Sequence, residues 1–214
     1  QTKVKWIQID EPTSSNSIGC DVVYMRDENV AMSIEDEFLV PISKNLVSQL
    51  KLVDSFFLNL PYDPENRFSV PFAWGTTGIG KLKSMKNNAV SSWKLLFDPK
   101  YKNHLVMMDD QRQTIGVALK YLGYSSNSTN PNELKQVEEL LLRQKKFIHE
   151  YRNKYTEDAQ HVIWFGHFNS NDILKDKMLE YILPQEGGMI WTYNIVIPKK
   201  SKNKDLSNAY TSFM

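Results

Sequence analysis

Short apolar runs alternate along the chain with segments of helical periodicity, and this alternation constrains the fold more than any other feature. The runs typical of strands are Val4–Ile9, Asp21–Met25, Phe68–Trp74, Leu105–Met108, His161–Phe165 and Met189–Ile197. The helical patterns cover 28–38, 43–60, 111–122, 131–151, 174–183 and 205–214. Because strands and helices alternate along the chain without an internal sequence repeat, we predict an α/β fold of mainly parallel sheets with flanking helices.

Composition excludes several classes of protein. The 26 Lys and Arg residues nearly balance the 25 Asp and Glu residues, and a net charge of +1 argues against a nucleic-acid binder. The longest apolar runs are far shorter than a membrane-spanning helix. Cys20 is the one cysteine, so no internal disulfide framework can form. Because Gln1 opens directly into an apolar run, we expect a mature or trimmed product.

The glycine-rich segment Gly75–Lys81 has the spacing of a phosphate-binding loop after a strand. Such loops continue with Ser or Thr, whose hydroxyl ligates magnesium, whereas this chain has Leu82. A bend between two packed units is the alternative interpretation. A nucleotide-binding enzyme therefore remains an alternative that Leu82 argues against.

The residues that usually carry catalysis form no convincing constellation. The four histidines, His104, His149, His161 and His167, are scattered and show no paired metal-ligand spacing. The adjacent carboxylates of Asp109 and Asp110 follow an apolar strand, where Asp110 is placed to cap the helix at 111–122. We therefore predict a protein that is not an enzyme and that holds neither a metal nor a cofactor.

Tryptophans accompany those carboxylates in the strand pattern. Trp74, Trp164 and Trp191 lie on or just beyond predicted strands, and Asp109–Asp110 lies at the carboxyl end of another. Open α/β sheets bind ligands outside such ends. Each indole face attracts an ammonium group by roughly 0.5–2 kcal/mol, and a carboxylate adds a charge-assisted hydrogen bond of roughly 1.5–3 kcal/mol. This combination predicts a cleft for a cation with an apolar stem.

Several motifs, occurring in the expected order, closely resemble the bacterial spermidine/putrescine-binding proteins, which are the solute receptors of polyamine ABC importers. They are Tyr62–Gly80, Val90–Phe97, Tyr101–Lys102, Met108–Arg112, Leu119–Ser125, Asn127–Pro131, Pro184–Trp191 and Ile197–Lys204. The resemblance is dense from Tyr62 to Pro131 and patchy elsewhere. Compared with this family the chain looks incomplete at both ends.

The resemblance implies a two-lobed, type 2 periplasmic-binding fold that captures a ligand between its lobes. Lobe one would hold residues 1–74 and 192–214, and lobe two residues 75–191. Two crossing strands would join them, with Gly75, Gly78 and Gly80 as hinge residues. The implied partners are a polyamine or related small cation and the permease subunits of an ABC transporter. The implied location is extracytoplasmic, in the periplasm or on the outer face of the membrane, where a lipid anchor is one means of attachment.

The family's binding residues carry over unevenly. Asp110 matches a carboxylate that holds an amine, and Trp191 and Trp164 match aromatic walls of the cleft. Where the family's spermidine binders place Glu and Asp, this chain has Gln113 and Tyr193. Losing two carboxylates that each meet an ammonium group removes roughly 3–6 kcal/mol of binding free energy.

The segment after 21–23 also departs from the family's Pro-Ser-x-Tyr-like binding loop. It places Arg26 where a positive charge would repel a polycation, although the neighbouring Asp27 could compensate. These departures leave open a second hypothesis, a surface receptor or lipoprotein of the same fold that no longer binds polyamines.

Overall fold

The computed structural model describes residues 19–43, 50–84, 91–153, 163–167 and 179–214. The chain divides into two compact units, which we call unit 1 (Gln1–Trp74 with Trp191–Met214) and unit 2 (Gly75–Ile190). It passes from one unit to the other twice, within strand β2 (Ser69–Leu82) and within strand β7 (Met189–Val196). That these units act as lobes that close on a ligand stays a prediction.

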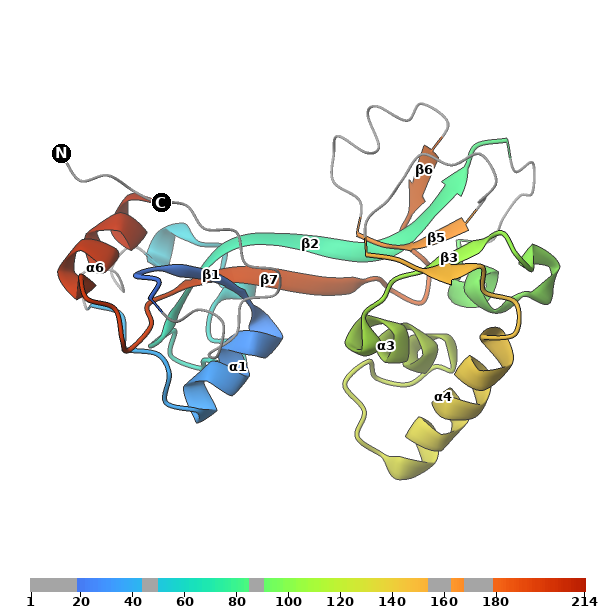
Figure 1. Ribbon diagram of the computed structural model, residues 1–214, viewed down its shortest axis with the longest axis horizontal. Coiled ribbons are helices and arrows are strands. Elements are labelled where there is room, and N and C mark those ends of the chain that lie inside the picture. The colour runs from blue at the N-terminus through green and yellow to red at the C-terminus, as the bar shows by residue number, and fades with distance from the viewer. Residues whose placement is uncertain (1–18, 44–49, 85–90, 154–162, 168–178) are drawn as a thin grey trace. The chain divides into compact units, whose positions relative to one another are not determined.

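Unit 1 is built on the antiparallel pairing of β1 (Val23–Arg26) with β7, in a register that sets Val23 opposite Val196. Helix α1 (Asp27–Glu35) follows β1 directly, and α6 (Lys204–Phe213) ends the described chain of this unit (Figure 1). The predicted helix over 43–60 is wrong for its described part, which forms 3₁₀ turns at Leu50–Leu52 and Ser55–Phe57. The core of unit 1 gathers apolar side chains of both strands, of α1 and of the segment after α1, namely Val23, Met25, Val30, Leu39 and Val196.

Unit 2 contains a mixed sheet. Its strands are the second part of β2, β3 (Leu105–Met107), β4 (Glu150–Tyr151), β5 (Ile163–Gly166) and β6 (Leu179–Ile182). β3 runs parallel to both β4 and β5, whereas β2 runs antiparallel to β5 and β6. The α/β class is confirmed, but the described pairings are mixed rather than mainly parallel.

Helices α3 (Gln111–Tyr121) and α4 (Pro131–Gln144) contact each other and lie together on one side of β3 in Figure 1. Both begin where local chemistry predicts. The Asp110 side chain accepts a hydrogen bond from the Gln113 N–H, and Asn130 caps α4 with Pro131 at its first position. Both caps satisfy backbone N–H groups that would otherwise lack a partner.

Two sequence predictions in unit 2 are wrong, both for the same reason. The helix expected to reach Tyr151 ends at Gln144, because Phe147 turns into the core and Glu150–Tyr151 pairs with β3. The helix expected over 174–183 has its described part in strand β6, which pairs with β2. In both failures a partner distant in sequence overrides a local helical pattern.

The strand expected at 4–9, in unit 1, lies outside the described residues.

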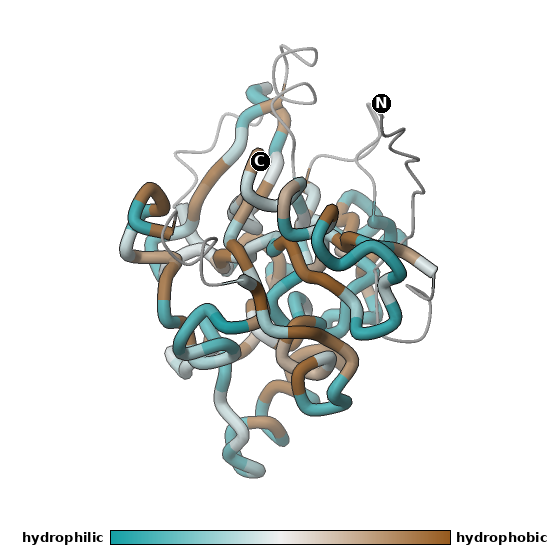
Figure 2. The backbone as a smooth tube through the Cα atoms, turned by 90° about the vertical axis from the view of Figure 1, so that its left-hand side faces the viewer, coloured by the Kyte–Doolittle hydropathy of each residue, from teal (hydrophilic) through white to brown (hydrophobic). Residues whose placement is uncertain are grey.

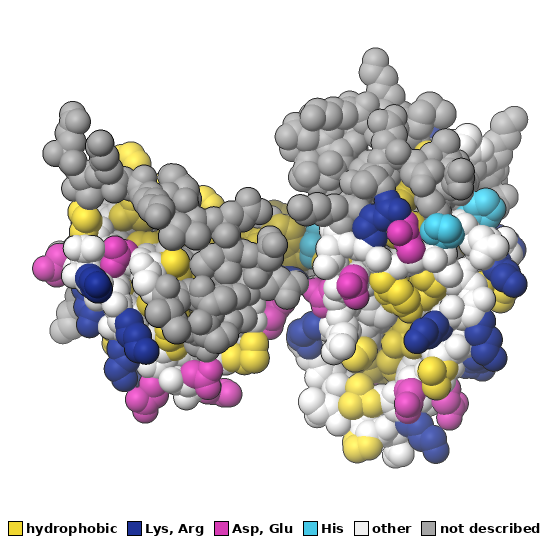
Figure 3. Space-filling view, viewed as in Figure 1, with side chains coloured by type: hydrophobic (Ala, Val, Ile, Leu, Met, Phe, Trp, Pro, Cys, Tyr) yellow, Lys and Arg dark blue, Asp and Glu magenta, His cyan; other side chains and the backbone are white. Residues whose placement is uncertain are grey.

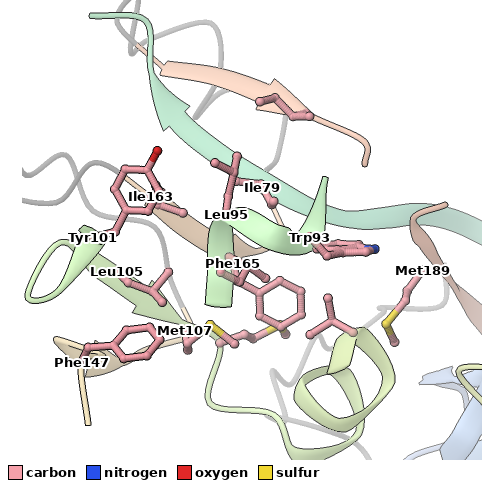
Figure 4. Packing of buried hydrophobic residues seen from close by; sticks show 14 residues of the cluster. Ile79, Trp93, Leu95, Tyr101, Leu105, Met107, Phe147, Ile163, Phe165 and Met189 are labelled. Carbon is pink, nitrogen blue, oxygen red and sulfur yellow. The ribbon is translucent and has the colours of Figure 1, made fainter. Parts of the chain in front are cut away.

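The core of unit 2 is built around Trp93, whose side chain is fully buried (Figure 4). Its ring packs edge to face against Phe165, with the ring centroids 5.8 Å apart. Strands β2, β3 and β5 supply Ile79, Leu105, Met107 and Ile163 to the same cluster. The hydrophobic stretches along the trace are short and are separated by hydrophilic ones (Figure 2). Among the described residues, no helix combines the length and the apolar character that crossing a bilayer requires.

A buried carboxylate fixes the entry of the chain into β2. Asp63 is 3% exposed, and its oxygens accept hydrogen bonds from the backbone N–H groups of Arg67, Phe68 and Ser69 and from the Ser69 hydroxyl, at 2.8–3.0 Å. One side chain therefore satisfies four donors in the turn that precedes the long strand. Hydrogen bonds to an ionised group are about twice as strong as neutral ones.

We expect Asp63→Ala to lower the free energy of unfolding by about 2–4 kcal/mol, because it leaves buried donors without an acceptor. Urea unfolding followed by tryptophan fluorescence measures this change. Asp54→Ala is a matched control, since Asp54 accepts only an exposed N–H in a short turn. Equal stability of the two variants would contradict the role assigned to Asp63.

Candidate functional site

The carboxyl ends of β3 and β5 lie at the same edge of the sheet in unit 2, because these two strands are parallel neighbours. Asp109 and Asp110 follow β3, and His167 follows β5. Ligands of α/β sheets bind outside such ends, where backbone direction changes and polar side chains can face outward. This edge is therefore the candidate site of unit 2.

Asp110 is held at this edge by its role as the N-cap of α3. Its Oδ1 accepts the Gln113 N–H at 3.0 Å, and the side chain is half-buried. The Thr114 hydroxyl donates to the Met108 carbonyl oxygen at 3.2 Å and fixes the same turn. The helix thus positions a carboxylate at the edge of the sheet, next to the more exposed Asp109.

A chain of three side chains runs beside Asp110. The Thr77 hydroxyl donates to Gln113 Oε1 at 2.8 Å and lies 3.0 Å from His167 Nδ1. Thr77 is fully buried and Gln113 is 4% exposed. The register of β2 with β5 explains the contact, because Gly78 pairs with Gly166 and their neighbours Thr77 and His167 come next in register. The structure thus brings the predicted residues Asp110 and Gln113 together.

His167 and Thr77 are the members of this site that the sequence did not single out. The sequence groups His167 with the other histidines as scattered and without paired metal-ligand spacing. The signal that could have found it is its place directly after an apolar strand, comparable to the place of Asp109 and Asp110 shortly after β3.

Trp164 does not belong to this hydrogen-bonded chain of side chains. It is 3% exposed and packs with Val106 and Leu179 in a core cluster of unit 2, so the expected aromatic wall is a core residue in this structure. Its place in the middle of a strand between two neighbours accounts for this burial.

The three predicted hinge glycines, Gly75, Gly78 and Gly80, lie inside the continuous strand β2. At Gly78 the reason for glycine is close approach, since an added Cβ would lie 2.6 Å from the Ile182 carbonyl oxygen and 2.6 Å from the Tyr181 hydroxyl. Tyr181 donates to the Thr76 carbonyl oxygen at 3.1 Å and contacts the Thr76 hydroxyl at 2.8 Å. Burial raises the pKa of Tyr181, and the hydrogen bond with Thr76 opposes that shift. A hinge role for these glycines stays a prediction.

The end of the glycine-rich segment does not form a phosphate cradle. Lys81 is 7% exposed, lies within β2, and its Nζ is 2.7 Å from Glu180 Oε2 on the paired strand β6. A phosphate-binding lysine has to reach the nucleotide from the loop. Among the residues that the structure describes, no group of three His, Cys, Asp or Glu side chains could hold a metal ion.

The predicted site residues of unit 1 lie on β7. Trp191 and Tyr193 are both half-buried and meet edge to face, with ring centroids 5.6 Å apart. Between them, the Thr192 N–H donates to Asp27 Oδ1 at 3.3 Å. An acidic side chain that the sequence offered as a compensating charge therefore lies beside the segment that carries the aromatic pair.

Hydroxyl and amide groups continue this arrangement around Thr192. The Tyr62 hydroxyl donates to Asn194 Oδ1 at 3.2 Å and lies 3.3 Å from Thr192 Oγ1. Asn194 Nδ2 donates to the same threonine oxygen at 3.3 Å. Burial raises the pKa of Tyr62, and its hydrogen bonds with Thr192 and Asn194 partly offset that rise.

Arg26, which the sequence suggested would repel a polycation, is a buried partner of Glu28. It is 6% exposed, and its Nε lies 3.1 Å from Glu28 Oε1. Burial raises the pKa of Glu28, while the Arg26 guanidinium acts in the opposite direction. The positive charge of Arg26 is thus largely neutralised within unit 1. Side chains of both signs are interspersed on the described part of the face drawn in Figure 3.

Two segments that carried the family resemblance bind each other in unit 2. Ser92 and the Trp93 N–H donate to the Glu186 carboxylate, and the Trp93 indole donates to the Gly187 carbonyl oxygen at 3.1 Å. Gly187 has a φ of +90°, which favours glycine. Two segments almost a hundred residues apart thus form one structural unit.

A family model described as bacterial extracellular solute-binding protein matches residues 20–214. The spermidine/putrescine-binding periplasmic protein of Salmonella typhimurium is 33% identical over 77% of this chain and 49% of its own length. The putrescine/cadaverine-binding protein of Pseudomonas aeruginosa is 29% identical over 94% of this chain and 62% of its own. The chain thus spans about half to three fifths of the length of these relatives.

Solved structures show the same similarity. The spermidine/putrescine ABC transporter substrate-binding protein PotD of Streptococcus pneumoniae superposes with a TM-score of 0.79 at 30% identity, covering 91% of this chain and 62% of that one. The Tp0655 lipoprotein of Treponema pallidum reaches a TM-score of 0.80 at 23% identity, which shows a shared fold. It covers 91% of this chain and 65% of that one.

The close approach at Gly78 can be tested with its cross-strand partner as the control. We expect Gly78→Ala to destabilise the protein by about 1–3 kcal/mol, because the new methyl group meets a backbone oxygen that cannot move aside freely. Gly166→Ala, whose Cβ would meet nothing within 4 Å, should change stability by less than about 1 kcal/mol. Thermal unfolding of both variants measures the difference, and similar melting temperatures would refute the packing argument.

Proposed function

The chain belongs to the family of bacterial extracellular solute-binding proteins, and on that premise we propose that it is the ligand-binding part of a receptor for small organic cations of the polyamine class. The observation that carries the proposal is the 33% identity to a spermidine/putrescine-binding protein over 77% of the chain. The receptor delivers its ligand to the permease of an ABC importer and works outside the cytoplasm. It carries out no chemical reaction on the ligand.

Asp110 is proposed as the anionic contact in unit 2. It is half-buried at the carboxyl edge of β3, where the N-cap geometry fixes its direction. An ammonium group that meets this carboxylate gains a charge-assisted hydrogen bond of about 1.5–3 kcal/mol. Gln113, one helical turn further on, lines the same place with a neutral amide.

Trp191 and Tyr193 are proposed as the ligand contacts of unit 1. Their edge-to-face packing holds both rings on β7 next to Asp27. An indole face attracts the ammonium group of a ligand and covers its methylene chain. The buried pairing of Arg26 with Glu28 supports this assignment, since it removes the repulsion that the sequence had suggested.

A second candidate function keeps the fold and changes the ligand. Gln113 and Tyr193 replace two carboxylates of the family, which favours a receptor that has lost affinity for polyamines. Calorimetric titration with putrescine and spermidine, beside neutral and acidic solutes of similar length, separates the two functions. Saturable binding of the diamines supports the first, and heat from the neutral or acidic solutes alone supports the second.

We expect Asp110→Asn to weaken putrescine binding by about 10- to 100-fold, because it removes the charge of the proposed anionic contact. Asparagine caps helices as well as aspartate does, so the fold should remain intact. Asp109→Asn removes one negative charge from the adjacent, exposed position and is the matched control. Equal losses in the two variants would point to a general field effect and contradict a direct contact.

We expect Trp191→Ala to weaken putrescine binding by about 3- to 30-fold through loss of the indole face. Trp191→Phe keeps an aromatic face and should recover part of the affinity. Isothermal calorimetry on both variants gives the ratio. An unchanged dissociation constant in the alanine variant would remove Trp191 from the proposed site.

A further inference from the structure

The hydroxyl group of Thr77 links Gln113 to His167 and allows few hydrogen-bond arrangements. It has a single proton, it is fully buried, and among the described residues it bonds only these two side chains. A buried hydroxyl proton without an acceptor is costly, so it must go to Gln113 or to His167. The direction in which Thr77 donates its proton therefore fixes whether Gln113 and His167 donate to it or accept from it.

In the observed arrangement Thr77 donates to Gln113 Oε1, so it accepts a hydrogen bond from a protonated His167 Nδ1. Gln113 Nε2 has no hydrogen-bond partner among the described residues, yet it is not among the buried polar atoms that lack one. The amide nitrogen therefore reaches solvent. The outward-facing atom of Gln113 is therefore a hydrogen-bond donor, and an ammonium group, which is itself only a donor, cannot bond to it.

The reversed arrangement has the opposite polarity. Gln113 Nε2 then donates to Thr77, Thr77 donates to an unprotonated His167 Nδ1, and Gln113 Oε1 faces outward as an acceptor. This state requires a neutral imidazole with its proton on Nε2. An imidazolium carries protons on both nitrogens, so Nδ1 cannot accept and the reversed arrangement is excluded.

We propose that His167 is a positioning residue for the ligand: through Thr77 it sets which atom of the Gln113 amide faces outward, and its protonation removes the acceptor that an ammonium group needs. The inference rests on the proposed function, since it assumes a cationic ligand beside Gln113. It predicts stronger binding when His167 is neutral and weaker binding as the pH falls.

Among the residues that the structure describes, the other titratable side chains on the elements next to His167 are of types that ordinarily keep their charge in this pH range. β5 itself carries none. Helix α3 carries Arg112, Lys120 and Tyr121, and Asp109 and Asp110 precede it. On β2 and β6, Lys81 is paired with Glu180 and Tyr181 bonds Thr76. Ordinary Asp, Glu, Tyr and Lys side chains titrate outside pH 5–8, whereas an ordinary imidazole titrates near pH 6.5. Alkyl ammonium groups of the ligand also keep their charge in that range.

The test is calorimetric titration of the wild-type chain with putrescine at pH 7.5 and pH 5.5. We expect affinity to fall about tenfold between the two, because imidazole side chains ordinarily pass from neutral to charged within this pH range. His167→Gln, which cannot titrate, should make the affinity independent of pH. His104→Gln is the matched control, because exposed His104 precedes β3 at the opposite edge of the sheet.

Thr77 variants distinguish positioning from direct charge repulsion. Thr77→Val removes the linking hydroxyl and should abolish the pH dependence, and Thr77→Ser should retain it. A tenfold pH effect that survives in Thr77→Val would mean direct repulsion by imidazolium and overturn the inference. Equal wild-type affinity at both pH values would also overturn it, while binding at neither pH would refute the proposed function itself.

A measurement on the wild-type chain avoids any loss of folding in the variants. Proton linkage is reciprocal, so saturating putrescine must lower the pKa of His167 if binding favours the neutral ring. An NMR titration of the imidazole with and without putrescine gives this shift. An unchanged His167 pKa in the bound protein would overturn the proposal.

Discussion

The parallel pairing of β3 with β5 is the constraint on which the candidate site of unit 2 depends. It brings two carboxyl ends to one edge, so that Asp110 and His167 lie at the same edge of the sheet although they are far apart in sequence. The antiparallel register of β2 adds Thr77 opposite His167. A slip of one residue would turn Thr77 to the other face of the sheet. Two features fix the register of β2. One is the close packing at Gly78, and the other is the turn in which Asp63 binds the first residue of the strand.

Sequence patterns predicted the parts of the fold whose causes are local. Helix α3 follows from the Asp110 cap, and α4 begins at Pro131 for equally local reasons. The end of α4 could not be predicted in this way, because residues 149–152 bond the backbone of β3. Strand β6 was mistaken for a helix because its partner residues on β2 lie about a hundred positions earlier. Periodicity carries no information on such distant partners.

The same distinction between local causes and distant partners applies to the residues of the candidate site. Asp110 could be proposed from its place after a strand, and its cap role from the next residues. Trp164 had the same kind of sequence signal and is a core residue, because burial on a central strand depends on both neighbouring strands. Thr77 carries no recognisable pattern, and the one sequence signal at His167 is its place after an apolar strand. Their contact depends on strand register, a property that no local segment contains.

The neutral amide of Gln113 has a different physical role from a carboxylate in the same place. A carboxylate accepts hydrogen bonds in every orientation, whereas an amide accepts at one end and donates at the other. At 4% exposure a carboxylate would be costly to desolvate before a cation arrives, while the amide is already satisfied by Thr77. Asp110, less buried at its cap, retains a charge without that penalty. Unit 2 therefore keeps its carboxylates at the more exposed positions Asp109 and Asp110 and places an orientable dipole at Gln113, where only a small part of the side chain reaches water. In the proposed receptor, selectivity for a cation would then depend on the direction of this hydrogen bond as well as on charge.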